Sequence, residues 1–230
     1  MEYVLTTNAL GKDYRQFKAL NGLSMHVPKG AIYGFVGKNG AGKTTLIRLI
    51  CGLQEPTSGS FTLYGIENSD RNIVKSRRRI GAVVETPSIY LDMTAEDNLK
   101  QQYRILGLPS YDGIPELLKL VGLANTGKKK TKNFSLGMKQ RLGIAIALAG
   151  DPDFLVLDEP INGLDPQGII EIRAAEPRTA DYRLDFQPHS RRTVPSCYSL
   201  RYHRQRTDGT GAFRRGTGSC LPQMYAHDGE

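Results

Sequence analysis

The sequence has no long hydrophobic run and only a few cysteines. None of its apolar runs approaches the roughly 20 residues that a membrane-spanning helix needs. The N-terminal segment is acidic and alternating, so we expect no signal peptide. The three cysteines are widely spaced and odd in number, which argues against a disulfide framework and a zinc site. With 39% hydrophobic and 23% charged residues in 230, the chain is typical of one soluble domain, and we expect it in the cytoplasm.

Lysine and isoleucine are missing from the last part of the chain, residues 174–230. All thirteen lysines precede Arg173, and the earlier part is rich in isoleucine. The apolar periodicity also stops after Arg173, where Arg, Pro, Thr and Asp take over. One domain rarely changes its composition so abruptly, so we divide the chain at this residue.

The chain carries a formal net charge of +8. Two basic clusters, Ser76–Arg79 and Lys128–Lys132, could contact nucleic acid. No aromatic residues on which bases could stack are interleaved with them, which favours a solvated surface. We therefore expect no nucleic-acid partner.

The segment Gly37–Thr44 reads G-K-N-G-A-G-K-T and matches the phosphate-loop pattern. A β-rich run, Ile32–Val36, precedes it, and an amphipathic helix is predicted from Thr45. Glycines let successive backbone N–H groups point at phosphate oxygens, and the helix N-terminus adds positive charge. A glycine-rich turn without a ligand is the alternative. The predicted nucleotide-binding residues are Gly37, Asn39, Gly40, Ala41, Gly42, Lys43, Thr44 and Thr45, with Lys43 on the β- and γ-phosphates and the Thr44 hydroxyl on Mg²⁺.

A second motif, F-L-V-L-D-E-P, begins at Phe154. The run Phe154–Leu157 suits a short buried parallel strand, and ligands bind beyond the carboxyl ends of such strands. Asp158 is therefore a predicted Mg²⁺ ligand, and Glu159 the base that takes a proton from the attacking water. Without the phosphate loop upstream, a surface turn would explain the two acids equally well.

A third motif, Phe134–Met138 in F-S-L-G-M, precedes an apolar stripe formed by Leu142, Ile146 and Ala149. Ser135 is suited to cap the N-terminus of this helix. Here the chain resembles the ATP-binding subunits of ABC transporters, whose signature reads close to L-S-G-G-Q. The resemblance implies a dimer in which the signature of one subunit caps the ATP held by the other. By this resemblance, the residues predicted to contact the ATP of the facing subunit are Ser135, Gly137 and Gln140.

Further landmarks of the same family follow in order. Tyr14 stands where an aromatic residue stacks on adenine, although a buried strand tyrosine is the alternative. Asp165 in P-I-N-G-L-D-P is expected to contact the facing subunit. Glu85 replaces the glutamine that senses the γ-phosphate, and with the following Pro and aromatic it resembles the bacitracin- and lantibiotic-resistance exporters.

The resemblance covers roughly residues 3–173 and implies an α/β fold. We expect a P-loop NTPase (RecA-like) with a mostly parallel sheet, an N-terminal antiparallel β part and an inserted helical subdomain at about 86–150. It implies ATP and Mg²⁺ as cofactors, and a separate transmembrane permease as partner at the inner face of the cell membrane. A soluble ABC ATPase acting in translation or DNA repair is the alternative function.

The tail departs from the family. An apolar strand and then a histidine that contacts the γ-phosphate should follow Gly168, and no such strand is visible. His189 stands at about the right distance, but Pro188 would remove a ladder hydrogen bond. If the reading frame is shifted one nucleotide later, the codons from Phe186 can encode S-S-H-I, the form that the family shows around its switch histidine. In the same shifted frame, the codons from Arg173 can encode E-L-L-N-R-E.

We therefore predict that residues 1–173 are an incomplete nucleotide-binding domain. Residues 174–230 are predicted to be a frameshifted translation, disordered or non-native, so that ATP binds weakly and turnover is very low. A native low-complexity tail would explain the boundary and the lost periodicity, but not the missing lysine and isoleucine.

Overall fold

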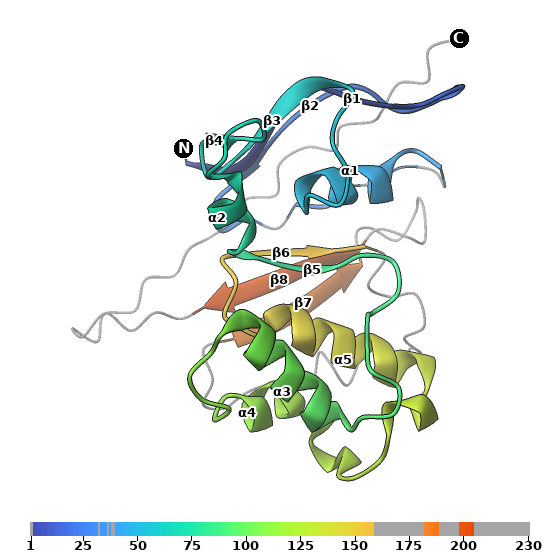
Figure 1. Ribbon diagram of the computed structural model, residues 1–230, viewed down its shortest axis with the longest axis vertical. Coiled ribbons are helices and arrows are strands. Elements are labelled where there is room, and N and C mark those ends of the chain that lie inside the picture. Colours follow the sequence, from blue (N-terminus) through green and yellow to red (C-terminus); the bar gives the residue numbers. More distant parts are fainter. Residues whose placement is uncertain are drawn as a thin grey trace, which may run out of the picture.

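A computed structural model describes residues 2–31, 33–35, 37, 40–158, 182–188 and 198–204. Its layers follow one another from top to bottom in Figure 1: an antiparallel sheet, helix α1, a parallel strand pair and a group of helices. The strands are β1 (Tyr3–Tyr14), β2 (Phe17–Pro28), β3 (Ser58–Leu63), β4 (Ile66–Glu67), β5 (Ile80–Val83), β6 (Phe154–Leu157), β7 (Tyr182–Pro188) and β8 (Tyr198–Arg204). The α-helices are α1 (Lys43–Ile50), α2 (Ile73–Arg77), α3 (Ala95–Leu106), α4 (Ile114–Leu120) and α5 (Leu136–Leu148).

The N-terminal sheet has the strand order β2-β1-β3-β4, and every pairing in it is antiparallel. In β3 the buried apolar side chains alternate, at Phe61 and Leu63, and α1 packs against that face with Leu46, Leu49 and Ile50. Alternation of this kind is what one covered sheet face requires. The antiparallel β part predicted from the sequence is confirmed.

The parallel part consists of β5 and β6, which pair from Ile80 opposite Phe154 to Val83 opposite Leu157. The strand predicted at Phe154–Leu157 is thus confirmed, although only Val156 of its four residues is buried. The strand predicted at Ile32–Val36 is not confirmed, because Tyr33, Gly34 and Phe35 are in no strand. A strand needs a neighbour for its hydrogen bonds, and among the described residues β6 pairs only with β5.

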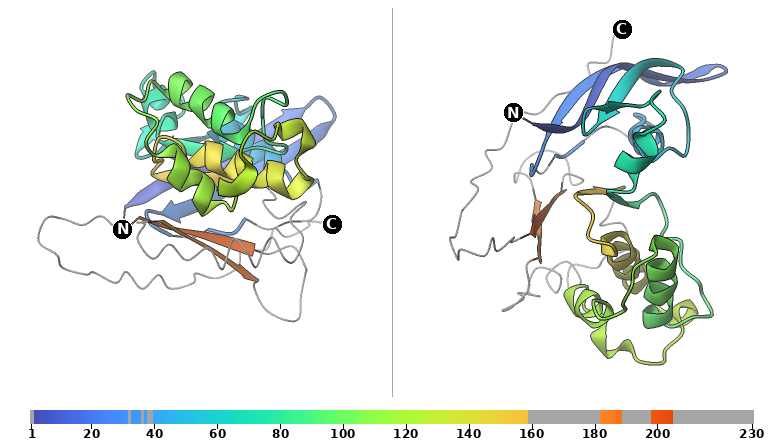
Figure 2. Two further views of the ribbon diagram at one scale, coloured as in Figure 1. Left: turned by 90° about the horizontal axis from the view of Figure 1, so that it is seen from below. Right: turned by 60° about the vertical axis from the view of Figure 1, so that its left-hand side comes forward.

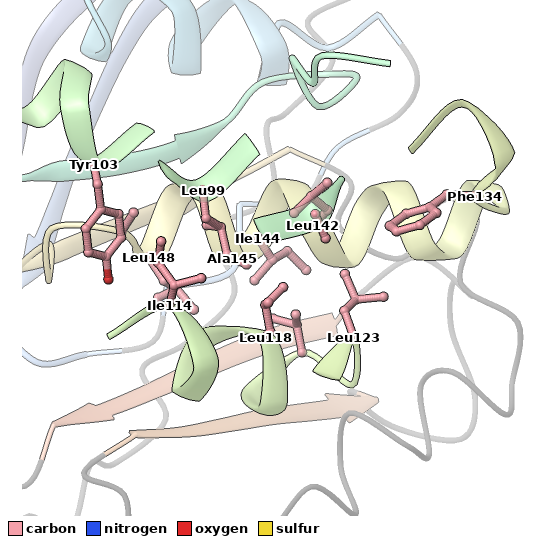
Figure 3. Packing of buried hydrophobic residues seen from close by; sticks show 13 residues of the cluster. Leu99, Tyr103, Ile114, Leu118, Leu123, Phe134, Leu142, Ile144, Ala145 and Leu148 are labelled. Atoms are coloured by element: carbon pink, nitrogen blue, oxygen red, sulfur yellow. The ribbon is translucent and has the colours of Figure 1, made fainter. Parts of the chain in front are cut away.

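The helical layer forms where the sequence predicted helices. Thr94 caps α3 by accepting a hydrogen bond from the Asp97 N–H, and Gly107 ends it in the left-handed conformation. Two short 3₁₀ turns, Ala124–Thr126 and Thr131–Asn133, lead into α5. Figure 3 shows the apolar side chains that α3, α4 and α5 direct toward one another, among them Leu99, Ile114, Leu118, Leu142 and Leu148.

Among the described residues, no helix is long and apolar enough to cross a membrane. The helices beside the parallel pair are instead short, and Figure 2 shows them gathered on one side of β5 and β6, away from the antiparallel sheet. The two subdomains therefore have separate apolar clusters, one under the antiparallel sheet and one among the helices.

Two segments of the tail form strands, which its irregular pattern did not predict. β7 and β8 pair antiparallel in a sheet of their own, from Tyr182 opposite Arg204 to Pro188 opposite Tyr198. Pro188 is the last residue of an edge strand, a position where the missing N–H is tolerated. His189 lies outside the described residues.

Candidate nucleotide-binding site

The phosphate loop leads into α1, and two of its glycines have the left-handed conformation. Gly40 has a φ of 87° and Gly42 a φ of 81°, values that side chains with a Cβ rarely adopt. Gly42 also touches β2, since a Cβ at this position would lie 2.1 Å from the Ala19 carbonyl oxygen. The backbone of β2 is thereby packed directly against the loop at Gly42.

Lys43 and Thr44, the first residues of α1, hold the loop and connect it to the parallel strands. The Lys43 ammonium donates to the Gly37 carbonyl oxygen at 2.9 Å, so the lysine folds over the loop. The Thr44 hydroxyl donates to Asp158 Oδ2 at 2.7 Å. Asp158 follows the carboxyl end of β6 and is only 5% exposed.

These groups fit a magnesium-bound triphosphate. Mg²⁺ prefers a few oxygen ligands from the protein and completes its shell with phosphate oxygens and water. The Thr44 hydroxyl and the Asp158 carboxylate supply two such oxygens in contact with each other. The cation of Lys43 and the N-terminus of α1 favour an anion beside them.

A cavity of about 270 Å³ opens over the loop. The residues that line it are Phe17, Ala19, Gly40, Gly42, Lys43, Thr44 and Thr45. Phe17 is 56% exposed although it is aromatic. Sequence analysis missed Phe17 and Ala19; their spacing of two on one strand, which places both on the same face, was the available signal.

Tyr14, predicted to stack on adenine, lies at the end of β1, directly opposite Phe17 in the strand pairing. Its hydroxyl donates to the Gln54 side chain beyond α1, and the Lys12 ammonium lies 5.4 Å from its ring centroid. It is not among the residues that line the cavity. Its contact with the base remains a prediction.

Glu85 follows β5 and forms an ion pair with Arg48 of α1. Its φ of 60° is in the left-handed region. Sequence analysis singled out Glu85 but missed Arg48, because no local spacing connects two residues that are 37 positions apart.

The signature residues lie at the start of α5. Ser135 is the predicted N-cap and is confirmed, since its hydroxyl accepts a hydrogen bond from the Met138 N–H at 3.2 Å. Ser135 is exposed and Gly137 is half-buried, whereas Gln140 is only 4% exposed and belongs to the core. Asn39, Glu159 and Asp165 lie outside the described residues.

A phosphate loop followed by a helix, with an aspartate at the end of a parallel strand, defines a P-loop nucleotide-binding domain. Comparison with known families then narrows the class. A family model described as ABC transporter matches residues 20–162. The chain belongs to the ABC transporter family.

Relatives within the family include antibiotic transport proteins. The chain is 49% identical over 173 residues to the bacitracin transport ATP-binding protein BcrA of Bacillus licheniformis, and this match covers 75% of the chain and 56% of BcrA. It is 46% identical over 170 residues to the lantibiotic transport ATP-binding protein SrtF of Streptococcus pyogenes, covering 74% of the chain and 72% of SrtF. The chain thus spans about half the length of several curated relatives that it matches.

Solved structures of ABC cassettes share the fold. CbiO1 of Clostridium perfringens, part of the ABC transporter complex CbiONQ, is 29% identical with a TM-score of 0.64 over 76% of the chain and 72% of CbiO1. The dimeric ATP-binding cassette MJ0796, bound to ADP and Pi in a post-hydrolysis state, is 25% identical with a TM-score of 0.67 over 74% of the chain and 80% of the cassette.

Proposed function

We propose that the chain is the ATP-binding subunit of an ABC transporter and couples ATP hydrolysis to the export of peptide antibiotics. The observation that carries the proposal is the contact between Thr44 and Asp158, which unites the phosphate loop and the end of β6. Relatives named for bacitracin and lantibiotic transport support a transport role over a role in translation or DNA repair.

Each group of the site has a task in this function. Lys43 and the loop N–H groups would bind the β- and γ-phosphates. Thr44 and Asp158 would hold Mg²⁺, which supplies positive charge against the phosphate oxygens. Glu159, directly after Asp158, would accept a proton from the attacking water.

Two partners belong to the proposal. A second ATPase subunit would meet the exposed start of α5, where Ser135 and Gly137 would contact its ATP, and Asp165 would reach the same interface. The similar cassette MJ0796 is described as dimeric, which supports this arrangement.

A transmembrane permease would dock at the inner face of the cell membrane. Its candidate contact is a cleft of about 880 Å³ between the nucleotide-binding core and the helices. The cleft has basic groups at Arg78 and Arg104, the ion pair of Arg48 with Glu85, and apolar residues such as Ile105 and Ile146.

We also propose that residues 174–230 are a frameshifted translation, as the composition and the shifted codons indicate. Matches to curated relatives extend over 170 to 174 of the 230 residues, which supports this boundary. The lack of a strand at Tyr33–Phe35 is in keeping with an incomplete sheet. The chain would then bind ATP but turn it over very slowly.

Equilibrium binding of a fluorescent ATP analogue to the full chain, with and without Mg²⁺, tests the nucleotide site. We expect Mg²⁺-dependent binding that Lys43→Ala abolishes, while Lys119→Ala, which removes an exposed lysine of α4, leaves it intact. Absence of binding by the unmodified chain would refute the proposal. Rapid hydrolysis that is lost in Glu159→Gln would instead contradict the slow turnover.

The frameshift is tested on the gene and its product. The DNA sequence across the codons for Glu171–Pro177, together with the intact mass of the expressed protein, decides the reading frame. A net one-base gain or two-base loss restricted to one sequencing read would restore an ordinary cassette. Agreement of both measurements with the present frame would make this chain a truncated cassette.

A further inference from the structure

Two side chains of helix α1 bond to residues that follow the two parallel strands. Thr44 contacts Asp158 beyond β6, and Arg48 forms an ion pair with Glu85 beyond β5. Thr44 and Arg48 are four residues apart and therefore lie on one face of the helix, separated by one turn of about 5.4 Å. The segments that carry the two acids are also adjacent, because β5 and β6 are parallel neighbours and the Asp158 N–H donates at 2.9 Å to the carbonyl of Val83, two residues before Glu85.

The segment that carries Glu85 is held at both ends. The φ of 60° at Glu85 is disfavoured for any residue with a Cβ, so neighbouring contacts must maintain it. Two residues later, Pro87 is packed against α5 so closely that a Cβ at Gly143 would lie 2.5 Å from the Pro87 Cβ. Arg48 provides the contact at the other end. The segment consequently connects the phosphate-loop helix with α5, the helix that Ser135 caps.

The charge of Glu85 makes this contact matter for an anionic ligand. Glu85 pairs with a residue one helical turn from Thr44, so a triphosphate bound at Thr44 and Asp158 would be near this carboxylate on the scale of the Debye length, about 8 Å at physiological salt. Without a cation it would repel the ligand. The Arg48 guanidinium forms an ion pair with it and offsets its charge.

We propose that Arg48 is a positioning residue for Glu85: it fixes this carboxylate and cancels its charge beside the nucleotide site. The inference rests on the proposed function, since it concerns binding of Mg²⁺-ATP. It assigns to Arg48 no contact with the nucleotide. Arg48 should therefore matter more for binding while residue 85 is a carboxylate than after it has been neutralised.

A double-mutant cycle with Arg48→Met and Glu85→Gln tests the proposal on the full chain, with a fluorescent ATP analogue at low salt. We expect Arg48→Met to weaken Mg²⁺-dependent binding by about three- to tenfold, as an uncompensated nearby charge would. Glu85→Gln alone should bind at least as well as the unmodified chain. Adding Arg48→Met to Glu85→Gln should then weaken binding clearly less than Arg48→Met does alone, and the difference between the two effects measures the positioning.

Hydrogen exchange without nucleotide provides a second measurement. Arg48→Met should speed exchange of the amides at positions 84–90, and Arg48→Lys should restore much of the protection by keeping a cation. Arg78→Met is the matched control, because Arg78 lines the same cleft but the ion pair of Glu85 is with Arg48.

The outcomes separate this inference from the proposed function. The inference would be overturned if Arg48→Met weakened nucleotide binding equally with Glu and with Gln at position 85, since Arg48 would then act on the ligand itself. Unchanged affinity and exchange in Arg48→Met would also overturn it while the site still bound ATP. Failure of the unmodified chain to bind would overturn the proposed function and this role together.

Discussion

The Thr44 hydroxyl donates to Asp158 Oδ2 across 2.7 Å, although 114 positions separate the two residues. Asp158 is buried, so this bond offsets part of the cost of removing a carboxylate from water. The same two oxygens are the ones that would ligate Mg²⁺. When Mg²⁺ binds, the two oxygens would exchange their mutual hydrogen bond for bonds to the cation. Neither polar group would then be left unsatisfied.

Thr44→Val keeps the shape of the side chain and removes the hydroxyl. We expect the free energy of unfolding to fall by about 1–3 kcal/mol, because a buried carboxylate loses its donor. Urea unfolding of the ligand-free chain measures this. Thr45→Val, at the next half-buried position of α1, is the control and should cost less. Equal losses in the two variants would show that the Thr44–Asp158 bond contributes nothing specific.

Asp158→Asn tests the metal site rather than stability. The amide is nearly isosteric but binds Mg²⁺ poorly, since hard cations prefer carboxylate oxygens. We expect the Mg²⁺-dependent gain in ATP affinity to disappear, while binding in the presence of a chelator stays the same or becomes stronger, because a carboxylate beside the phosphates is removed. Titrations with and without Mg²⁺ give the result. A retained Mg²⁺ dependence would place the cation elsewhere.

A comparison of Gly42→Ala with Gly40→Ala distinguishes backbone strain from a steric clash in the phosphate loop. Both glycines have positive φ, so each alanine costs roughly 1–2 kcal/mol in backbone strain. Only Gly42 meets an obstacle, the Ala19 carbonyl, whereas nothing lies within 4 Å of a Cβ at Gly40. We expect Gly42→Ala to be the more destabilising by at least about 1 kcal/mol in urea unfolding. Comparable losses would mean that β2 yields at this contact.

Motifs with local geometry were the part of the site that sequence could predict. The phosphate loop and Asp158 each belong to a short segment whose conformation depends on its own residues, and the structure places Thr44 and Asp158 in contact. The limits of α3 were equally accessible, since Thr94 and Gly107 mark its ends.

Features that depend on distant partners were not accessible. The run at Tyr33–Phe35 has a strand-like composition, but a strand forms only where a neighbour supplies hydrogen bonds. The ion pair of Arg48 with Glu85 arises because β5 and α1 meet in space, and no periodicity indicates it.

Gly143→Ala probes the contact of α5 with the segment after β5. In an open helix position alanine would stabilise by about 0.5–1 kcal/mol. Here its Cβ would lie 2.5 Å from the Pro87 Cβ, so we expect a net loss of stability. Pro87→Gly removes the colliding atoms, and in that background Gly143→Ala should become neutral or stabilising. A urea-unfolding cycle measures this coupling, and additive effects would contradict a direct contact.

Cys51 should make the chain less stable at alkaline pH. Burial raises the pKa of its thiol to about 11, with Arg77 opposing the rise, whereas an unfolded thiol titrates near roughly 8.5. Between these values the unfolded chain has lost a proton that the folded chain keeps, so rising pH favours unfolding. Below this window the contribution is constant. We therefore expect the free energy of unfolding to fall more steeply from pH 8.5 to 11 in the unmodified chain than in Cys51→Ala, as followed by urea unfolding at each pH. Parallel pH profiles would show that the thiol is accessible to water and titrates normally in the folded chain.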